Sequence, residues 1–136
     1  MPRPPMRVSG PVLDSADPVG LARFYERLLG WPIATVEGPR PGFPPEDGWA
    51  IMRSPAGDMK YEFQYGEHYV PPVWPPAVGE QQMMIHMDIG VPDLEAGVAW
   101  ALECGAILAG HQPQEEVRVM LDPAGHPFCL FPDDRL

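Results

Sequence analysis

The sequence predicts an α+β fold built from two βαβββ modules, and three observations lead to this fold. Two amphipathic helices, at 17–30 and 93–105, each begin at an aspartate and end at a glycine, which are residue types that cap helices. A turn of similar sequence recurs at 54–58 and 122–126, and a proline-rich stretch, 66–80, separates the halves. We therefore expect a duplicated module whose strands form a curled mixed sheet around a cleft.

The chain length of 136 residues suits a single domain. We divide it into module one at 6–65, a link at 66–80 and module two at 81–132. No apolar stretch reaches the ~20 residues of a membrane span, and the first residues lack the apolar segment of a secretory signal. Cys104 and Cys129 form no CxxC pair, so we expect free thiols and a cytoplasmic protein.

The first half has the expected order of strand, helix and three strands. Pro18 suits the first position of the helix, and Gly57 permits the positive φ that the turn between the last two strands needs. The helix carries an apolar face made of Leu21, Phe24, Tyr25, Leu28 and Leu29. The expected strands are Arg7–Leu13, Ile33–Glu37, Trp49–Ser54 and Lys60–Tyr65.

The second half repeats this order. In its first strand, Met83–Val91, apolar residues alternate with more polar ones, so one face turns to the core and the other stays more polar. The helix has an apolar stripe made of Leu94, Val98, Ala101 and Leu102. The remaining strands are expected at Ala106–Ala109, Glu116–Leu121 and Phe128–Phe131. A ferredoxin-like or other α+β sandwich is the alternative, and the matching helix starts and turns favour the duplication.

The formal charge of −10 and the pI of about 4.6 limit the kinds of partner that the protein can bind. Such a surface repels phosphate backbones and anionic lipids, so we expect neither nucleic acid nor membrane as a partner. Acidic groups in a cleft would instead favour a small organic ligand that is cationic.

Three segments resemble the vicinal oxygen chelate superfamily, the glyoxalase/bleomycin resistance/dioxygenase proteins, and most of all its glyoxalase-like domain branch. They are 14–31, which contains the helix start DSADP and the helix end LLGW, then 86–96 (HMDIGVPDLEA) and 122–130 (DPAGHPFCL). This superfamily includes isomerases, lyases, dioxygenases and drug-sequestering proteins. The resemblance therefore implies the fold and leaves the activity open.

The resemblance also implies where a metal would be held. Enzymes of this superfamily usually bind one divalent ion with side chains from four strands, and the ion polarises substrate oxygens. The matching positions are Gly10 and His86, seven residues before each helix-opening aspartate, and Tyr61 and Cys129, four residues after each turn glycine. Gly10 offers no ligand, and Cys129 stands where the metalloenzymes usually have glutamate. We therefore expect no metal and no other cofactor, with a divalent metal held by His86 and Glu62 as the alternative.

The strand Lys60–Tyr65 decides which residues reach the cleft. If Tyr61, Phe63 and Tyr65 face the core, Glu62 and Gln64 face the cleft. A slip of one residue would exchange the two faces.

Three functions stay open on the sequence alone. The first is binding of a small organic molecule in the cleft between the modules, without a complete metal site. The second is a metal-dependent lyase, isomerase or dioxygenase of the glyoxalase I type that uses His86 and Glu62. The third is a metal-free enzyme in which His86 is a general base and Glu62 or Asp88 its partner. His86 and Glu62 are thus the candidate catalytic residues, and whether the protein is an enzyme is undecided.

The expected ligand-binding residues combine aromatic and thioether surface with a few polar groups that fix orientation. They are Tyr61, Phe63, Gln64, Trp74, Met84, His86, Asp88 and Cys129. No GxGxxG or Walker pattern occurs, so no nucleotide is implied. We expect a homodimer, because a stiff proline-rich link can carry one module away from the other and pairing covers exposed sheet edges.

Overall fold

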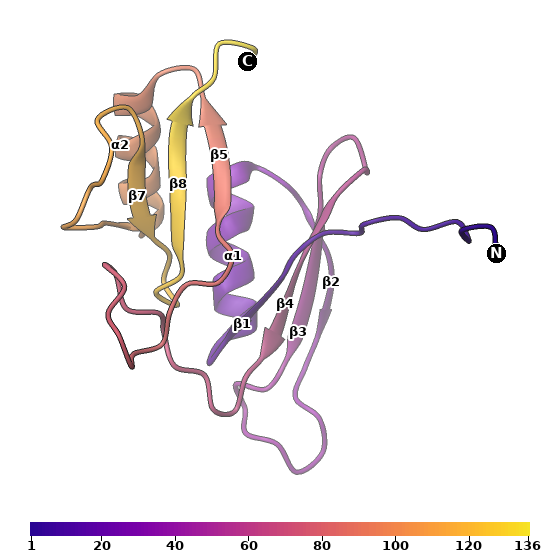
Figure 1. Cartoon of the computed structure of the whole chain (residues 1–136). Coiled ribbons are helices and arrows are strands. Elements are labelled where there is room, and N and C mark those ends of the chain that lie inside the picture. The colour runs from indigo at the N-terminus through magenta and orange to yellow at the C-terminus, as the bar shows by residue number, and fades with distance from the viewer. The chain divides into compact units, whose positions relative to one another are not determined.

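The structure, a computed structural model, describes residues 1–136 and contains the two expected βαβββ modules (Figure 1). They form two compact units, Met1–Glu67 and His68–Leu136. The expected mixed sheet is present as two four-stranded sheets, one in each module. The α+β fold class is thereby confirmed.

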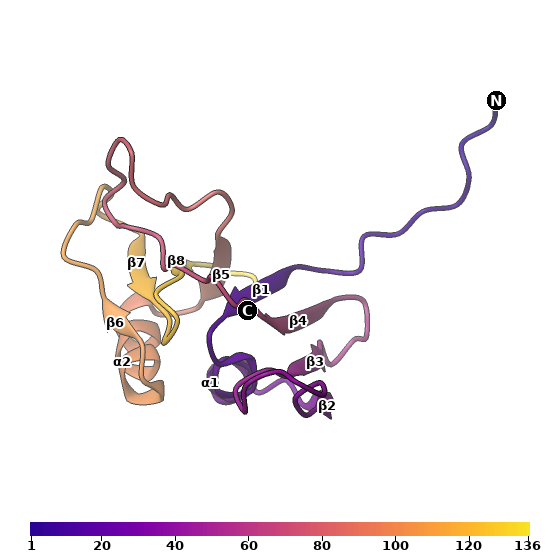
Figure 2. The ribbon, with the colours of Figure 1, turned by 90° about the horizontal axis from the view of Figure 1, so that it is seen from below.

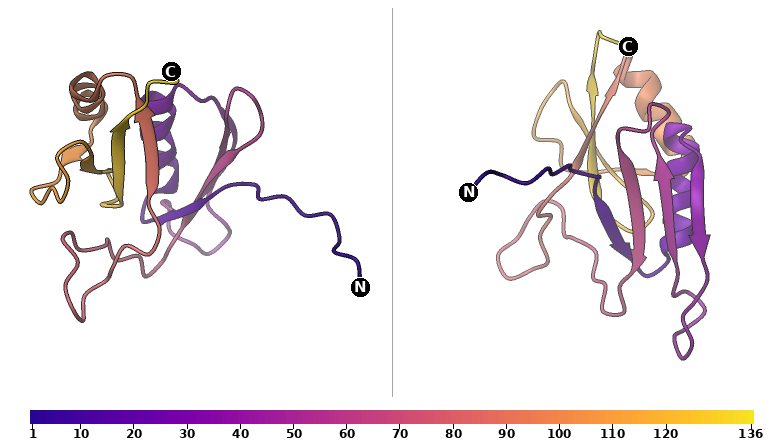
Figure 3. Two further views of the ribbon diagram at one scale, coloured as in Figure 1. Left: turned by 45° about the horizontal axis from the view of Figure 1, so that its top comes forward. Right: turned by 90° about the vertical axis from the view of Figure 1, so that its right-hand side faces the viewer.

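Module one contains five elements. They are β1 (Val12–Ser15), α1 (Pro18–Leu29), β2 (Ile33–Glu37), β3 (Trp49–Arg53) and β4 (Lys60–Tyr65). The strand order is β1-β4-β3-β2, with β1 parallel to β4 and the other pairs antiparallel (Figure 2). The helix packs on one face of this sheet (Figure 3), so the opposite face is not covered by a helix of this module.

The start of α1 follows from its capping residues. The Asp17 side chain accepts a hydrogen bond from the backbone N–H of Gly20 at 3.1 Å, and Gly30 ends the helix in the left-handed conformation. Leu21, Phe24 and Tyr25 are buried against the sheet. The apolar stripe read from the sequence is thus the core face of α1.

The first strand begins later than predicted, at Val12 instead of Arg7. Pro11 has no N–H and Gly10 has a φ of 145°, so residues 7–11 cannot continue a regular ladder. Two bonds to β4 still remain there. The N–H groups of Lys60 and Glu62 donate to the carbonyl oxygens of Ser9 and Pro11 at 2.9 and 3.0 Å.

Module two repeats the arrangement with β5 (Met87–Val91), α2 (Leu94–Cys104), β6 (Ile107–Leu108), β7 (Arg118–Leu121) and β8 (Pro127–Pro132). The strand order is β5-β8-β7-β6, again with one parallel pair, β5 and β8. The predicted strand Met83–Val91 is shorter in the structure because β5 pairs only with β8, which begins at Pro127. Residues 83–86 therefore have no partner strand, and Met84 is 86% exposed.

The strands β6 and β7 are also shorter than predicted because a side chain replaces part of their ladder. The amide of Gln112 donates to the carbonyl oxygens of Ala109 and Val119, each at 2.9 Å, and accepts from the Val119 N–H at 2.8 Å. These bonds satisfy backbone groups that a longer strand pair would otherwise satisfy.

Most of the proline-rich link belongs to module two. The Tyr69 hydroxyl donates to the Ala124 carbonyl oxygen at 2.6 Å, and the Trp74 indole N–H donates to the His111 carbonyl oxygen at 2.9 Å. Pro71 lies where a side chain at Gly125 would collide, 2.8 Å from the Cβ position. The link expected at 66–80 is thus anchored from His68 onward. Neither helix combines the length and apolar character that crossing a membrane requires.

Candidate functional site

Side chains alternate between the two faces of the sheet along β4, and this alternation decides which predicted site residues of module one lie in the core. Tyr61 and Phe63 are 5% and 0% exposed and contact the ring of Tyr25 on α1. Their assignment as ligand-binding residues is therefore corrected, because they form the core under the helix. Burial raises the pKa of Tyr61 to about 12. Gln64, on the opposite face, is exposed.

Glu62 lies on the free face, but its carboxylate is engaged. One oxygen accepts a hydrogen bond from the Trp49 indole N–H, and the other accepts from the Lys60 ammonium at 3.0 Å. Partial burial raises the pKa of Glu62, and these two hydrogen bonds together with the Lys60 charge more than offset that effect, so the pKa lies below its usual range. Glu62 is thus held ionised and paired.

Gly10, the first metal position implied by the resemblance, is a steric requirement of module one. A Cβ atom there would lie 1.8 Å from the carbonyl oxygen of Lys60, far inside van der Waals contact. The φ of 145° is also one that residues with a side chain rarely adopt. No ligand side chain can therefore stand at this position unless the backbone moves.

Module two brings three predicted residues together. A His86 nitrogen, an Asp88 oxygen and the Cys129 sulfur lie within 4.8 Å of one another, and His86 Nε2 is 3.2 Å from Asp88 Oδ1. Asp88 and Cys129 are register partners on β5 and β8. Burial raises the pKa of the Cys129 thiol, and the charge of Asp88 and its hydrogen bond raise it further. The thiol form of Cys129 is therefore favoured near neutral pH.

Two of these three residues, His86 and Cys129, line a small, mostly apolar cavity of about 130 Å³ in module two. Three residues that the sequence predicted to bind the ligand, Trp74, His86 and Cys129, line it, and so does Met83, whereas the predicted Met84 does not. The exchange follows from the late start of β5, because alternation does not hold outside a strand. The other lining residues are Pro113, Gln114, Val117, Val119 and Pro127.

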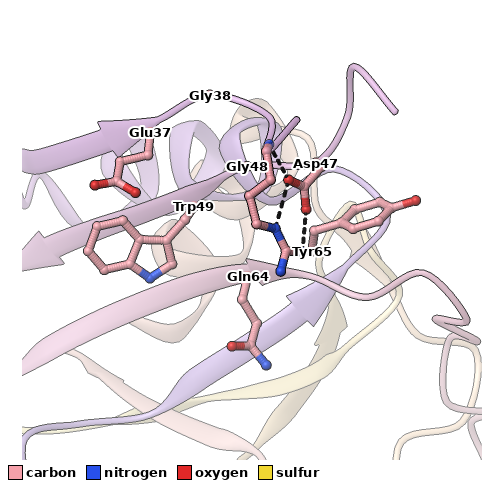
Figure 4. A pocket seen from close by; sticks show the side chains of 8 residues that line it. Glu37, Gly38, Asp47, Gly48, Trp49, Gln64 and Tyr65 are labelled. Carbon is pink, nitrogen blue, oxygen red and sulfur yellow. Dashed lines mark hydrogen bonds and ion pairs between the residues drawn. The ribbon is translucent and has the colours of Figure 1, made fainter. Parts of the chain in front are cut away.

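A larger hollow of about 430 Å³ lies in module one, beside the loop that joins β2 to β3 (Figure 4). Its lining includes Glu37, Arg40 and Asp47, none of which the sequence assigned to a site, together with Trp49 and the predicted ligand-binding residue Gln64. The buried Asp47 accepts hydrogen bonds from the Arg40 backbone N–H and guanidinium, at 2.7 to 3.1 Å, and these hold the Asp47 pKa below its usual range. The prolines indicated a loop, but only its folded form turns these side chains inward.

The residues present do not fit the four-strand metal site that the resemblance implies. Gly10 cannot carry a ligand, Tyr61 faces the core, and Lys60 already places a positive charge beside Glu62. Only His86, Asp88 and Cys129 are grouped closely enough to share one ion. A metal held by this group would have an aspartate ligand outside the implied set.

The pKa shift of Cys129 leads to a prediction. In a Cys104→Ser background, Asp88→Asn removes the negative charge that raises the thiol pKa and leaves only a weaker, uncharged acceptor, so the thiolate fraction grows. We expect alkylation by iodoacetamide at pH 8 to become several-fold faster, measured by mass spectrometry. Asp134→Asn, an exposed aspartate, is the control and should leave the rate unchanged. A rate unaffected by Asp88→Asn would contradict the prediction.

Comparisons with known proteins agree with this architecture. A family model described as a glyoxalase-like domain matches residues 11–131. Among solved structures, a glyoxalase/bleomycin resistance protein/dioxygenase family enzyme from Burkholderia phytofirmans PsJN is 14% identical, with a TM-score of 0.64, and the match covers 93% of this chain and 98% of that one. A glyoxalase family protein from Bacillus cereus is 15% identical with a TM-score of 0.63, over 96% and 95% of the two chains.

A glyoxalase family protein from Enterococcus faecalis is 20% identical with a TM-score of 0.57, over 92% of this chain and 94% of that chain. At these identities the likeness concerns the fold. No curated protein matches the sequence.

Proposed function

The chain belongs to the glyoxalase-like domain family, with the vicinal oxygen chelate fold, and on this premise we propose that it binds a small organic molecule without a complete metal site. The observation that carries the proposal is the approach of Gly10 to Lys60, which leaves no room for the first ligand. Glu62 also supports the proposal, because its two carboxylate oxygens already accept hydrogen bonds from Trp49 and Lys60.

The module-two cavity supports the binding part of the proposal. Its indole, thioether and aliphatic lining offers apolar contact, and the His86 imidazole supplies a polar group at its edge. Ligand sites of proteins commonly combine these features. A homodimer also stays a prediction, and light scattering at micromolar concentration tests it.

A second candidate function is a metal-dependent lyase, isomerase or dioxygenase. It was assigned to His86 and Glu62, but the grouping that favours it is His86, Asp88 and Cys129. Imidazole, carboxylate and thiolate are all zinc ligands. The raised pKa of Cys129 weighs against this candidate, because a thiol must lose its proton to bind the ion.

Metal analysis separates the two functions. Protein purified without chelator and then dialysed against micromolar zinc is expected to retain substoichiometric metal, and His86→Ala is expected to leave that content unchanged. The measurement is mass spectrometry of the dissolved elements, with Cys104→Ser as the control for non-specific thiol binding. One equivalent of tightly held zinc, lost in both His86→Ala and Cys129→Ser, would contradict the metal-free proposal and support the second candidate.

A further inference from the structure

We propose that the module-one hollow is a binding site for an organic ammonium ion, held between the indole face of Trp49 and the carboxylate of Glu37. The site deepens the proposed function, on which it rests, by naming the chemical class of the ligand. Three features carry it: a row of cross-strand neighbours, a balance of charge, and a ring held in place.

The row consists of Glu37 on β2, Trp49 on β3 and Gln64 on β4. Glu37 is the register partner of Trp49, and Trp49 is the register partner of Gln64. Register partners in antiparallel strands carry their side chains on the same face, a few ångströms apart. Figure 4 shows the indole of Trp49 between the Glu37 carboxylate and the Gln64 amide. All three line the hollow of about 430 Å³.

One carboxylate that lines the hollow has no positively charged partner. Arg40 is paired with Asp47 at 2.8 Å, and Glu62 is paired with Lys60 at 3.0 Å. Glu37 has no ion pair or side-chain hydrogen bond, and it is exposed. The hollow therefore carries one uncompensated negative charge, in a chain whose net charge of −10 already attracts cations.

The indole ring of Trp49 is held in one orientation. Its N–H donates to Glu62, which Lys60 holds from the other side, so the ring cannot turn freely. A fixed aromatic face beside a carboxylate is the arrangement that attracts an alkylated ammonium ion, through the ring quadrupole and the charge together. The volume of the hollow suits a small organic molecule.

The Arg40–Asp47 pair closes one side of the hollow and keeps the β2–β3 loop in place. Asp47 is buried and accepts three hydrogen bonds from Arg40, whose guanidinium also lies 3.9 Å from the Phe43 ring centroid. Because its charge is neutralised by Asp47, Arg40 opposes a bound cation only weakly. The pair is therefore part of the wall and does not direct an anion into the site.

The experiment titrates ¹⁵N-labelled protein with choline, a quaternary ammonium ion, and with its uncharged isostere 3,3-dimethylbutan-1-ol. Choline is expected to shift the Trp49 indole and Gln64 amide signals with saturation, and the isostere to shift them little. Glu37→Gln is expected to weaken choline binding about tenfold. Glu46→Gln, which removes an exposed carboxylate of the same loop that does not line the hollow, should change it less than about twofold.

Three outcomes would overturn the inference. Equal shifts by the isostere would show a site without preference for charge, and equal weakening by Glu46→Gln would show only the long-range field. Shifts confined to the Trp74 indole would place the ligand in module two, which leaves the proposed function standing. The module-two cavity is tested separately with a screen of uncharged aromatic compounds. If none of them shifts the Trp74 indole signal, the cavity is not a binding site, and the choline result is unaffected. Well-dispersed spectra of each variant show that it is folded.

Discussion

Gly10→Ala is expected to lower the free energy of unfolding of module one by about 3 kcal/mol. The reason is steric: the new Cβ atom would lie 1.8 Å from the Lys60 carbonyl oxygen and 2.9 Å from its carbon. Both are backbone atoms of β4, so no side chain can rotate away. The strand that carries Glu62 and Gln64 must move, or the segment 9–11 must detach. Urea denaturation followed by tryptophan fluorescence measures the loss.

The control separates the clash from the cost of an unusual φ. Gly42 also has a positive φ, of 83°, but a Cβ atom there would meet nothing within 4 Å. Gly42→Ala should therefore cost only about 1 kcal/mol. Equal losses for the two variants would contradict the proposed clash.

A Gly10→His variant extends the test to function. It supplies the imidazole that the family's metal site would need, yet we expect destabilisation and no gain of zinc, because the backbone contact is unchanged. A stable Gly10→His protein that binds one zinc ion would refute both the steric argument and the metal-free proposal.

Phe63→Ala is expected to cost about 3–5 kcal/mol, the usual loss when a buried aromatic ring is truncated. Phe63 is fully buried, and its ring stacks on Tyr25 with centroids 5.8 Å apart. Its removal leaves a cavity between the sheet and α1 that the packed neighbours cannot fill. The expected result is a large fall in the urea midpoint.

Two companion variants distinguish a core residue from a ligand contact. Phe43→Ala, which truncates a ring that is 43% exposed, should cost less than about 1 kcal/mol. Phe63→Leu keeps most of the volume and should bind choline as the unsubstituted protein does. If Phe63→Leu lost binding while the fold stayed stable, Phe63 would be a ligand contact after all.

The elements that the sequence predicted well are those that depend on neighbours along the chain. Asp17 and Gly30 cap α1 through groups three or four residues away, and the strand Lys60–Tyr65 shows its two faces through its own alternation. The same holds for the turn at 122–126, where Asp122 accepts hydrogen bonds from the N–H groups of Ala124 and His126. Such signals are short-range, so one sequence suffices to read them.

The state of each candidate site residue depended on partners that are distant in sequence. Glu62 was correctly placed on the free face, yet only strand pairing brought Trp49 and Lys60 to its two oxygens. His86, Asp88 and Cys129 were all expected to bind the ligand, but only the parallel pairing of β5 with β8 brought Asp88 beside Cys129. Met84 lost its predicted role because β8 begins at Pro127, too late in the chain to pair with it.

By itself the sequence determined the duplicated βαβββ order, the helix limits and the core face of β4. Helix capping, side-chain periodicity and turn chemistry depend on residues that are close together in the chain. Only the tertiary structure decided that Gly10 is required by the carbonyl of Lys60, and that Glu37, Trp49 and Gln64 form one row. Register between strands is set by the packing of whole faces and not by any local residue. For this reason the chemistry of the module-one hollow emerged only when the sheet was assembled.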